Sequence, residues 1–295
     1  MFWQLLANGL VTGSVIAIAA VGVSLVYGIL RLVNFAYGDY MAFGALAAYE
    51  LNGPLGLGIV VSVLFAMVAT AVLSVALDLA LWRPLRRRRA GFMSLFLASI
   101  GLALVLRQAL LLAYGPQPRT YTVDPYKVYV VGSVRLSEAQ FVTIVVAAVA
   151  IVFVGVLLSR STVGRTMRAL ADDGALAGIA GVNVGRVIAY TWIVSGLLAG
   201  LAGVLAALIQ TSFNPNFGFQ LLLPVFAGVV LGGVGSAYGA LAGGLVLGVA
   251  MELSTWPALW GGGVDPVYKP VVAFVVLIAA LMVRPQGLFG RARFV

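Results

Sequence analysis

The side chains that could carry out chemistry are few in this chain, and they exclude most enzyme classes. The sequence contains no histidine and no cysteine, so it lacks the commonest general base, a thiol nucleophile and thiolate metal ligands. Its nine carboxylates are scattered, except for Asp172 and Asp173, whose adjacent side chains would diverge on a helix. It also lacks the GxxxxGK[ST] pattern of a phosphate-binding loop. We therefore expect no catalytic residue, no metal site and no cofactor in this chain.

Residues 161–187 form the longest stretch that is both charged and compatible with a helix. Ser161 or Thr162 can act as its N-cap, and Arg168 and Asp172 are spaced to share one helix face as an ion pair. The pattern predicts a short amphipathic helix that lies on the membrane surface and is too polar to cross. An ordinary connecting loop is the alternative interpretation.

An apolar ridge and a glycine complete this charged stretch. Gly181 suits the left-handed position that follows a helix end, and Asn183 would extend the exit turn. We expect the helix to end before Gly181. The residues of the ridge are Met167, Leu170, Leu176 and Ile179.

Two further stretches, residues 34–39 and 228–235, interrupt apolar segments with polar residues or glycines. In transporters, a broken helix frees backbone groups that line a polar path. The alternatives are a plain helix end and, for the glycines, close helix packing. We expect the two breaks to face each other across a central cavity, with Asp39 at the cytoplasmic mouth. The expected path residues are Asn34, Tyr37, Gly38, Gly228, Gly232, Gly233 and Gly235.

Arg107 and Glu252 are charged residues inside predicted membrane spans. An unpaired charge at the centre of a bilayer costs at least about 2.5 kcal/mol. Counting from the helix starts places both residues in the outer half of the bilayer. Two interpretations remain open, an ion pair between Arg107 and Glu252 or extension of each side chain to the outer surface.

The composition identifies the chain as lipid-embedded. Of its 295 residues, 62% are hydrophobic and 9% are charged, and the mean hydropathy is +1.10. These values exclude an ordinary soluble domain of the same length. The 36 glycines fit this class, because small residues let membrane helices approach closely.

Apolar runs along the chain predict an all-α polytopic bundle of eight or nine transmembrane segments, forming one domain over residues 1–295. Two of the segments are short and either could be re-entrant, and the arginine-rich run 83–89 is expected to stop the third span. Residues 115–136 are expected to form an external loop. The predicted spans are 2–30, 32–49, 51–81, 90–113, 139–159, 187–211, 220–235, 238–255 and 266–283.

The distribution of basic residues orients the bundle. If the 83–89 loop is cytoplasmic, the cytoplasmic side carries 13 arginines and the outer side four basic residues. The N-terminus then lies outside, whereas the 161–187 loop and the tail lie inside. The net charge of +9 therefore reflects orientation and lipid contact, and it does not imply nucleic-acid binding.

Four motifs, taken in order, resemble the permeases of the branched-chain amino acid uptake family of ABC importers. The first is YG at 27–28 followed by VNFAYGD at 33–39. Tyr37 in this motif stands where relatives commonly carry histidine. The second is RA.ADD at 168–173 with a glycine eight residues after the second acid. The third and fourth are LGGVGS at 231–236 and RPQGLFGR at 284–291.

This resemblance implies a role for the charged stretch and a set of partners. Residues 161–187 would be the cytoplasmic coupling helix that contacts the ATPase. The implied partners are two ATP-binding cassette subunits that bind ATP and Mg²⁺, a second permease that is a related chain or a copy of this one, and an extracytoplasmic solute-binding protein. The chain would be a multi-pass protein of the cytoplasmic (inner) membrane of a bacterium or archaeon. The implied coupling residues are Gly164, Arg165, Arg168, Ala169, Asp172, Asp173, Ala177 and Gly181.

Other functions remain open at the level of sequence. A related permease could carry urea, short amides or another small solute. A secondary transporter would need buried carboxylates in mid-membrane, and Asp39 is the one candidate. A structural or enzymatic membrane protein is disfavoured because the catalytic groups are missing.

Overall fold

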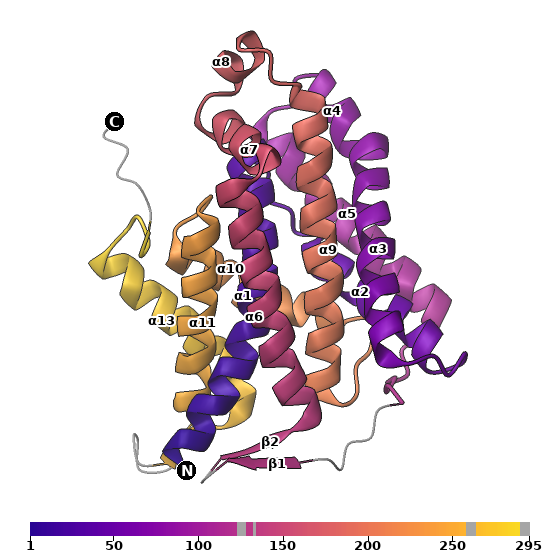
Figure 1. Ribbon diagram of the computed structural model, residues 1–295, viewed down its shortest axis with the longest axis vertical. Coiled ribbons are helices and arrows are strands. Elements are labelled where there is room, and N and C mark those ends of the chain that lie inside the picture. The colour runs from indigo at the N-terminus through magenta and orange to yellow at the C-terminus, as the bar shows by residue number, and fades with distance from the viewer. Residues whose placement is uncertain (123–127, 132–133, 258–263, 290–295) are drawn as a thin grey trace.

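The computed structural model describes residues 1–122, 128–131, 134–257 and 264–289, and nearly all of them are helical (Figure 1). Six helices or helical runs are long and apolar enough to cross a membrane, which confirms the all-α polytopic class. They are α1 (Phe2–Leu30), the run of α3 (Ile59–Leu77), η1 (Asp78–Trp82) and α4 (Arg83–Arg87), α5 (Phe92–Tyr114), α6 (Glu138–Arg160), α9 (Val184–Gln210), and the run of η2 (Pro266–Tyr268) and α13 (Lys269–Val283).

Shorter elements complete the bundle and cover its two ends. Figure 1 places α4, α7 and α8 at one end, and the two strands and the N-terminus at the other. This arrangement puts the charged 161–187 stretch and the arginine-rich run on the same side, as the distribution of basic residues predicted. The shorter elements are α2 (Tyr37–Asn52), β1 (Val128–Val131), β2 (Val134–Ser137), α7 (Thr162–Asp172), α8 (Gly174–Ile179), α10 (Phe217–Gly232) and α11 (Ala237–Leu253).

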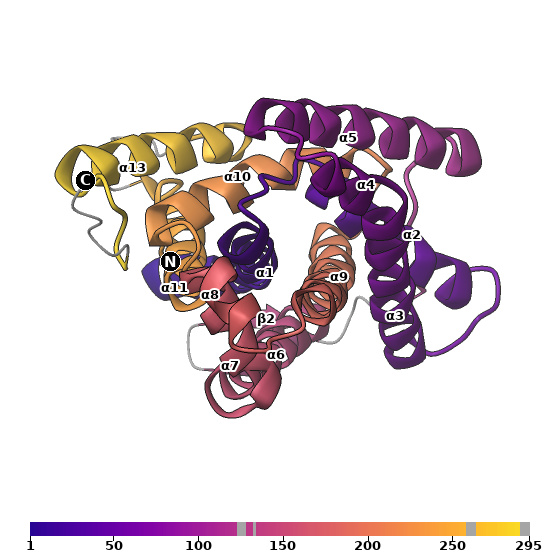
Figure 2. The same ribbon diagram turned by 90° about the horizontal axis from the view of Figure 1, so that it is seen from above.

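The helix α1 is the centre of the bundle. Figure 2 shows it surrounded by α6, α9, α10 and α11. Small residues let the backbones meet: a side chain added at Gly244 would collide with Ala17, and one added at Gly248 would collide with Gly13. Such contacts between small residues are the usual basis of helix packing in membranes.

The third span ends inside the arginine-rich run, as predicted, but at Arg87, beyond the predicted end at residue 81. The helix continues through Pro84 to Arg87. A proline normally breaks a helix because it lacks an N–H and clashes with the carbonyl one turn earlier. Here the preceding turn is a π-helix, Asp78–Trp82, whose wider winding changes that register. Arg86 also returns to Asp78 with an N–O distance of 2.6 Å.

The hairpin of β1 and β2 lies in the stretch that the sequence analysis treated as an irregular loop. Val128 pairs with Ser137 and Val131 with Val134 in antiparallel register. Gln4 of α1 fastens the hairpin, because its amide donates to the Arg135 carbonyl at 2.8 Å and accepts from the Arg135 N–H at 2.7 Å. The run of valine and tyrosine was the signal for these strands.

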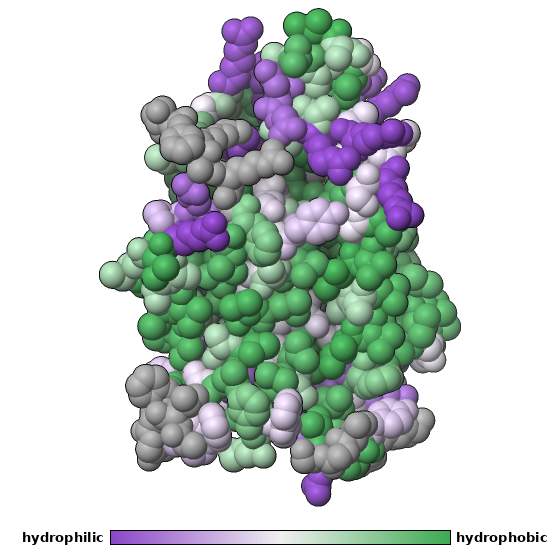
Figure 3. Space-filling model, turned by 60° about the vertical axis from the view of Figure 1, so that its left-hand side comes forward, coloured by the Kyte–Doolittle hydropathy of each residue, from purple (hydrophilic) through white to green (hydrophobic). Residues whose placement is uncertain are grey.

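The surface shows the banding expected of a membrane protein. In Figure 3 a broad hydrophobic belt separates the end that carries α7 and α8 from the opposite end. The strongly hydrophilic side chains gather mainly at the α7–α8 end. A belt of this kind matches the hydrocarbon core of a bilayer.

Candidate functional site

The charged stretch forms two helices where the sequence predicted one. Ser161 is the N-cap of α7 and accepts from the Gly164 N–H at 2.9 Å, as predicted. Asp173 adopts an extended conformation and ends α7. Its carboxylate then caps α8 by accepting from the N–H groups of Ala175 and Leu176 at 2.9 and 3.0 Å. The second acid of the motif therefore determines where the second helix begins.

The helix α7 is anchored against the rest of the bundle. Met167 and Leu170 are buried. Gly164 lies so close to the end of α6 that a side chain there would collide with the Leu158 carbonyl. Arg168 donates to the same carbonyl at 2.7 Å. The predicted Arg168–Asp172 pair is not among the ion pairs of the described residues, because the guanidinium turns back to α6.

The helix α8, in contrast, presents its apolar side chains outward. Leu176 is 64% exposed and Ile179 is 85% exposed, at the tip of the molecule (Figure 1). The predicted ridge is therefore divided, with the α7 half buried and the α8 half free. Gly181 has φ +85°, as predicted for a residue after a helix end. Ala177 is buried, whereas Arg165, Arg168, Ala169, Asp172, Asp173 and Gly181 are exposed.

The first predicted break is real, but its residues are enclosed. The chain leaves α1 through Arg31, winds through 32–36 and begins α2 inside the bundle. The Asn34 side chain accepts from the Ala36 N–H at 3.1 Å. The Tyr37 hydroxyl donates to the Ser195 carbonyl at 3.2 Å. Both side chains are at most 1% exposed, so they have little access to a passing solute in this conformation.

Gly38 belongs to the same break and meets the start of α10. A side chain at Gly38 would collide with the Gly218 carbonyl, and one at Gly218 would collide with Gly38. The Phe35 and Phe226 rings are also in contact, with centroids 5.0 Å apart. The break therefore packs against α10 without an intervening cavity at these contacts.

The glycine cluster at 228–235 packs against other helices. Gly228 lies against Gly244 and Gly232 against Gly239 on α11, and Gly235 lies against Gly28 of α1. Gly233 has φ +105° and forms the end of α10. These contacts match the packing interpretation of the cluster, which the sequence analysis had kept as the alternative.

Two of the family-like motifs meet at the end of α10. The Leu288 N–H donates to the Leu231 carbonyl at 2.8 Å, and the Phe289 N–H donates to the Gly232 carbonyl at 3.0 Å. Gly287, with φ +76°, lies directly against Gly233. The LGGVGS and RPQGLFG stretches thus form one unit in which the tail caps a helix. Their distance in sequence hid this contact.

The predicted ion pair between Arg107 and Glu252 does not form. Arg107 pairs with Asp39, at 3.2 Å between Nε and Oδ1, and Glu252 pairs with Lys269 at 2.7 Å. The helix α5 lies against α2, whereas α11 lies against α13. Asp39 is therefore engaged in a buried pair inside the bundle, and the expectation that it sits at the cytoplasmic mouth is wrong.

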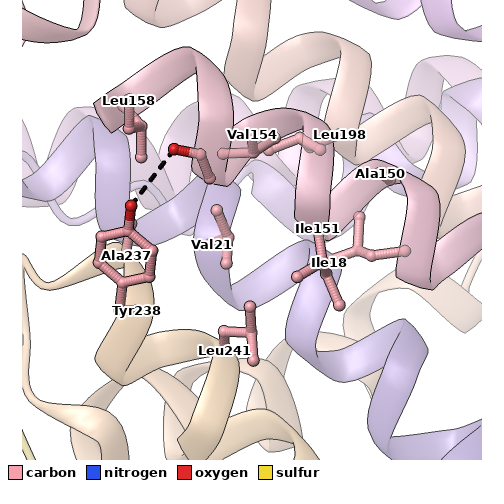
Figure 4. A pocket seen from close by; sticks show the side chains of 11 residues that line it. Ile18, Val21, Ala150, Ile151, Val154, Leu158, Leu198, Ala237, Tyr238 and Leu241 are labelled. Atoms are coloured by element: carbon pink, nitrogen blue, oxygen red, sulfur yellow. Dashed lines mark hydrogen bonds between the residues drawn. The ribbon is translucent and has the colours of Figure 1, made fainter. Parts of the chain in front are cut away.

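A small pocket lies between four helices, and it is apolar. Side chains of α1, α6, α9 and α11 line it (Figure 4). The Tyr238 hydroxyl donates to the Gly155 carbonyl at 3.3 Å. The free volume is 20 Å³, which suits about one water molecule. This pocket is too small and too apolar to hold a zwitterionic amino acid.

Comparison with known proteins gives a consistent result over the whole chain. A family model described as "Branched-chain amino acid transport system / permease component" matches residues 5–281. The high-affinity branched-chain amino acid transport system permease proteins BraD of Pseudomonas aeruginosa and LivH of Escherichia coli are each 32% identical, over 98% of this chain and 96% of theirs. A probable LivH permease of Methanocaldococcus jannaschii is 27% identical over 97% of this chain and 92% of its own length.

A solved structure supports the fold. PsaBC from Streptococcus pneumoniae, in complex with Fab, superposes with a TM-score of 0.50 and covers 97% of this chain and 94% of its own. The sequence identity is 16%. The likeness is one of fold alone.

Proposed function

Because the chain belongs to the family of permease components of branched-chain amino acid transport systems, we propose that it is the transmembrane permease subunit of an ABC importer. Its solute would be a branched-chain or related hydrophobic amino acid. The observation that carries this proposal is the match to such permeases over nearly the full chain. The chain itself contributes the membrane path and no catalysis.

The helix α8 is the proposed contact with the ATPase. A docking helix must be held firmly by its own subunit while it offers a free surface to the partner. The burial of Met167 and Leu170 on α7 meets the first need. The exposure of Leu176 and Ile179 on α8 meets the second. Apolar side chains at the tip of a polar end are a typical mark of a protein interface.

The remaining parts of the transporter are supplied by other chains in this proposal. Two ATP-binding cassette subunits would bind ATP and Mg²⁺ and hydrolyse the nucleotide. A second permease, either a related chain or a copy of this one, would complete the membrane path. An extracytoplasmic binding protein would deliver the solute. The complex would lie in the cytoplasmic (inner) membrane of a bacterium or archaeon, with α7 and α8 on the cytoplasmic side.

The test of this function is purification of the chain from mild detergent and identification of the proteins that accompany it. We expect ATPase subunits and a solute-binding protein, and we expect leucine, isoleucine or valine to bind that protein in a titration. Reconstituted complex should then take up leucine when ATP is supplied. Co-purified partners whose binding protein takes urea or an amide, with no amino acid bound, would contradict the proposed substrate.

The proposed orientation predicts a labelling pattern in intact cells. The native chain has no cysteine, so all thiol labelling of this chain comes from the single cysteine that is introduced. Cysteines in place of the exposed Arg87 and Ala175 should be shielded from an impermeant thiol reagent, because both would face the cytoplasm. A cysteine in place of the exposed Thr122, in the loop predicted to be external, should react. Permeabilised cells provide the control, and labelling of Ala175→Cys from outside would reverse the orientation.

A further inference from the structure

The guanidinium of Arg107 lies between a carboxylate and an aromatic ring. Its Nε and Nη2 atoms are 3.2 and 3.5 Å from the two carboxylate oxygens of Asp39. Its central carbon lies 4.1 Å from the centre of the Phe219 ring. Three helices, α2, α5 and α10, therefore meet at one side chain. The Nη1 atom makes no hydrogen bond within the described part of the chain, although a guanidinium has five N–H donors.

This arrangement lies at an open face of the bundle. Asp39 is 1% exposed, but the Arg107 side chain is 14% exposed and Phe219 is 43% exposed. The neighbouring Gln108 on α5 and Gln220 on α10 are both exposed. Figure 2 shows α5 and α10 along the same side of the bundle.

Polar side chains at this depth are not suited to lipid. Arg107 and Gln108 lie within a membrane-spanning helix, and Gln220 lies in the first turns of α10. Charged and polar groups inside membrane segments normally face a water-filled space or another protein surface. Elsewhere the exposed residues of α5 are largely apolar, such as Leu97, Leu104 and Leu112. Arg107 and Gln220 therefore mark a polar point between α5 and α10 on a face that is otherwise apolar.

The chemistry of this group matches a hydrophobic amino acid in its zwitterionic form. The free edge of a guanidinium binds a carboxylate through charge-assisted hydrogen bonds. The exposed ring of Phe219 offers an apolar contact for an aliphatic side chain. The amide oxygen of Gln220, the residue that follows Phe219, is an acceptor for an ammonium group. Arg107 and Phe219, which are in contact, thus offer partners for the carboxylate and for the aliphatic side chain of the solute.

We propose that Arg107 binds the carboxylate of the transported amino acid as it passes along the α5–α10 face, between this chain and the second permease subunit. This inference rests on the proposed function. Asp39 acts as a positioning residue that fixes the guanidinium and balances its charge. A partly neutralised arginine binds an anion weakly enough to release it, as a transport path requires.

The structural alternative is that Asp39 and Arg107 only fasten α5 to the bundle. The pair Glu252–Lys269 provides a matched comparison, because it is also a membrane ion pair, at 2.7 Å, but it joins α11 to the start of α13. A purely structural role predicts the same consequence when either pair is broken. A solute-binding role predicts a difference between them.

The experiment measures ATP-driven leucine uptake by the complete transporter in proteoliposomes. The variant Arg107→Gln should reduce uptake per assembled complex by about tenfold or more. Arg107→Lys should retain part of the uptake, because it keeps the charge but not the planar fork. Lys269→Gln leaves Glu252 without its ion-pair partner, so its yield can fall, but its uptake per assembled complex should equal that of the wild type. Equal losses in Arg107→Gln and Lys269→Gln, or normal uptake in Arg107→Gln, would overturn the inference.

A second measurement applies even if Arg107→Gln fails to assemble. In the complete transporter, a cysteine at Gln220, next to the Phe219 ring that contacts Arg107, should react with a hydrophilic thiol reagent, and leucine should slow the reaction. A cysteine at Val149, an exposed residue in the middle of α6, should stay unreactive in lipid. A Gln220→Cys that is as unreactive as Val149→Cys would overturn the inference. Leucine uptake by the wild-type complex separates this failure from failure of the proposed function.

Discussion

Replacing the two exposed apolar residues of α8 with aspartate, Leu176→Asp together with Ile179→Asp, is expected to abolish solute-stimulated ATP hydrolysis. Both side chains are exposed, and α8 lies at the tip of the molecule (Figure 1), so the substitutions need not disturb the permease itself. Two carboxylates would have to be desolvated in the docking groove of the ATPase, which costs more than the apolar contact contributes. ATP hydrolysis by reconstituted complex, with and without loaded binding protein, measures the effect.

The matched control exchanges the same two residues while keeping their volume, as Leu176→Ile with Ile179→Leu. This variant should retain most of the stimulation, because volume-conserving apolar exchanges are well tolerated. Monodisperse behaviour of both variants in detergent shows that the permease still folds. Stimulation at the wild-type level in the double aspartate variant would show that α8 does not contact the ATPase.

The variant Gly232→Val is expected to prevent the permease from folding. A side chain at Gly232 would collide with the carbonyl of Gly239, so α10 and α11 would have to separate. Overpacking in a core typically costs about 1–3 kcal/mol, and a collision with backbone leaves less room for relaxation than a collision with side chains. The yield of monodisperse protein from the membrane should fall several-fold.

Gly101→Val is the control for this experiment. Gly101 lies on α5 with no atom within 4 Å of an added side chain, so its replacement should leave the yield unchanged. If Gly232→Val folds normally but loses transport, Gly232 faces a space that the solute uses. That result would restore the path hypothesis for the glycine cluster.

The features that the sequence predicted well are those decided by local chemistry. The first helix covers Phe2–Leu30 as predicted, because an uninterrupted apolar run of this length has one stable state in a membrane. Ser161 caps its helix and Gly181 has a positive φ. Both depend on a few neighbouring residues and on no distant partner.

The errors arose where the outcome depends on which helices are neighbours. Arg107 and Glu252 lie in comparable positions along their helices, but pairing follows helix contacts, and α5 lies against α2. Pro84 alone predicts a helix end, yet the π-helical turn before it keeps the helix continuous. The spacing of Gly228 and Gly232 is compatible both with close helix packing and with a path for the solute. Only the partner backbone distinguishes the two roles.

The cap that Leu288 and Phe289 place on α10 affects the order in which the protein matures. A ribosome releases α10 and then α11 and α13 before it reaches the residues that satisfy the last carbonyls of α10. Until then those carbonyls need water or the translocon as a substitute. The end of α10 and the glycine contacts around it therefore reach their final state only when synthesis of residues 284–289 is complete. A chain released before Leu288 would leave the carbonyls of Leu231 and Gly232 without these two partners.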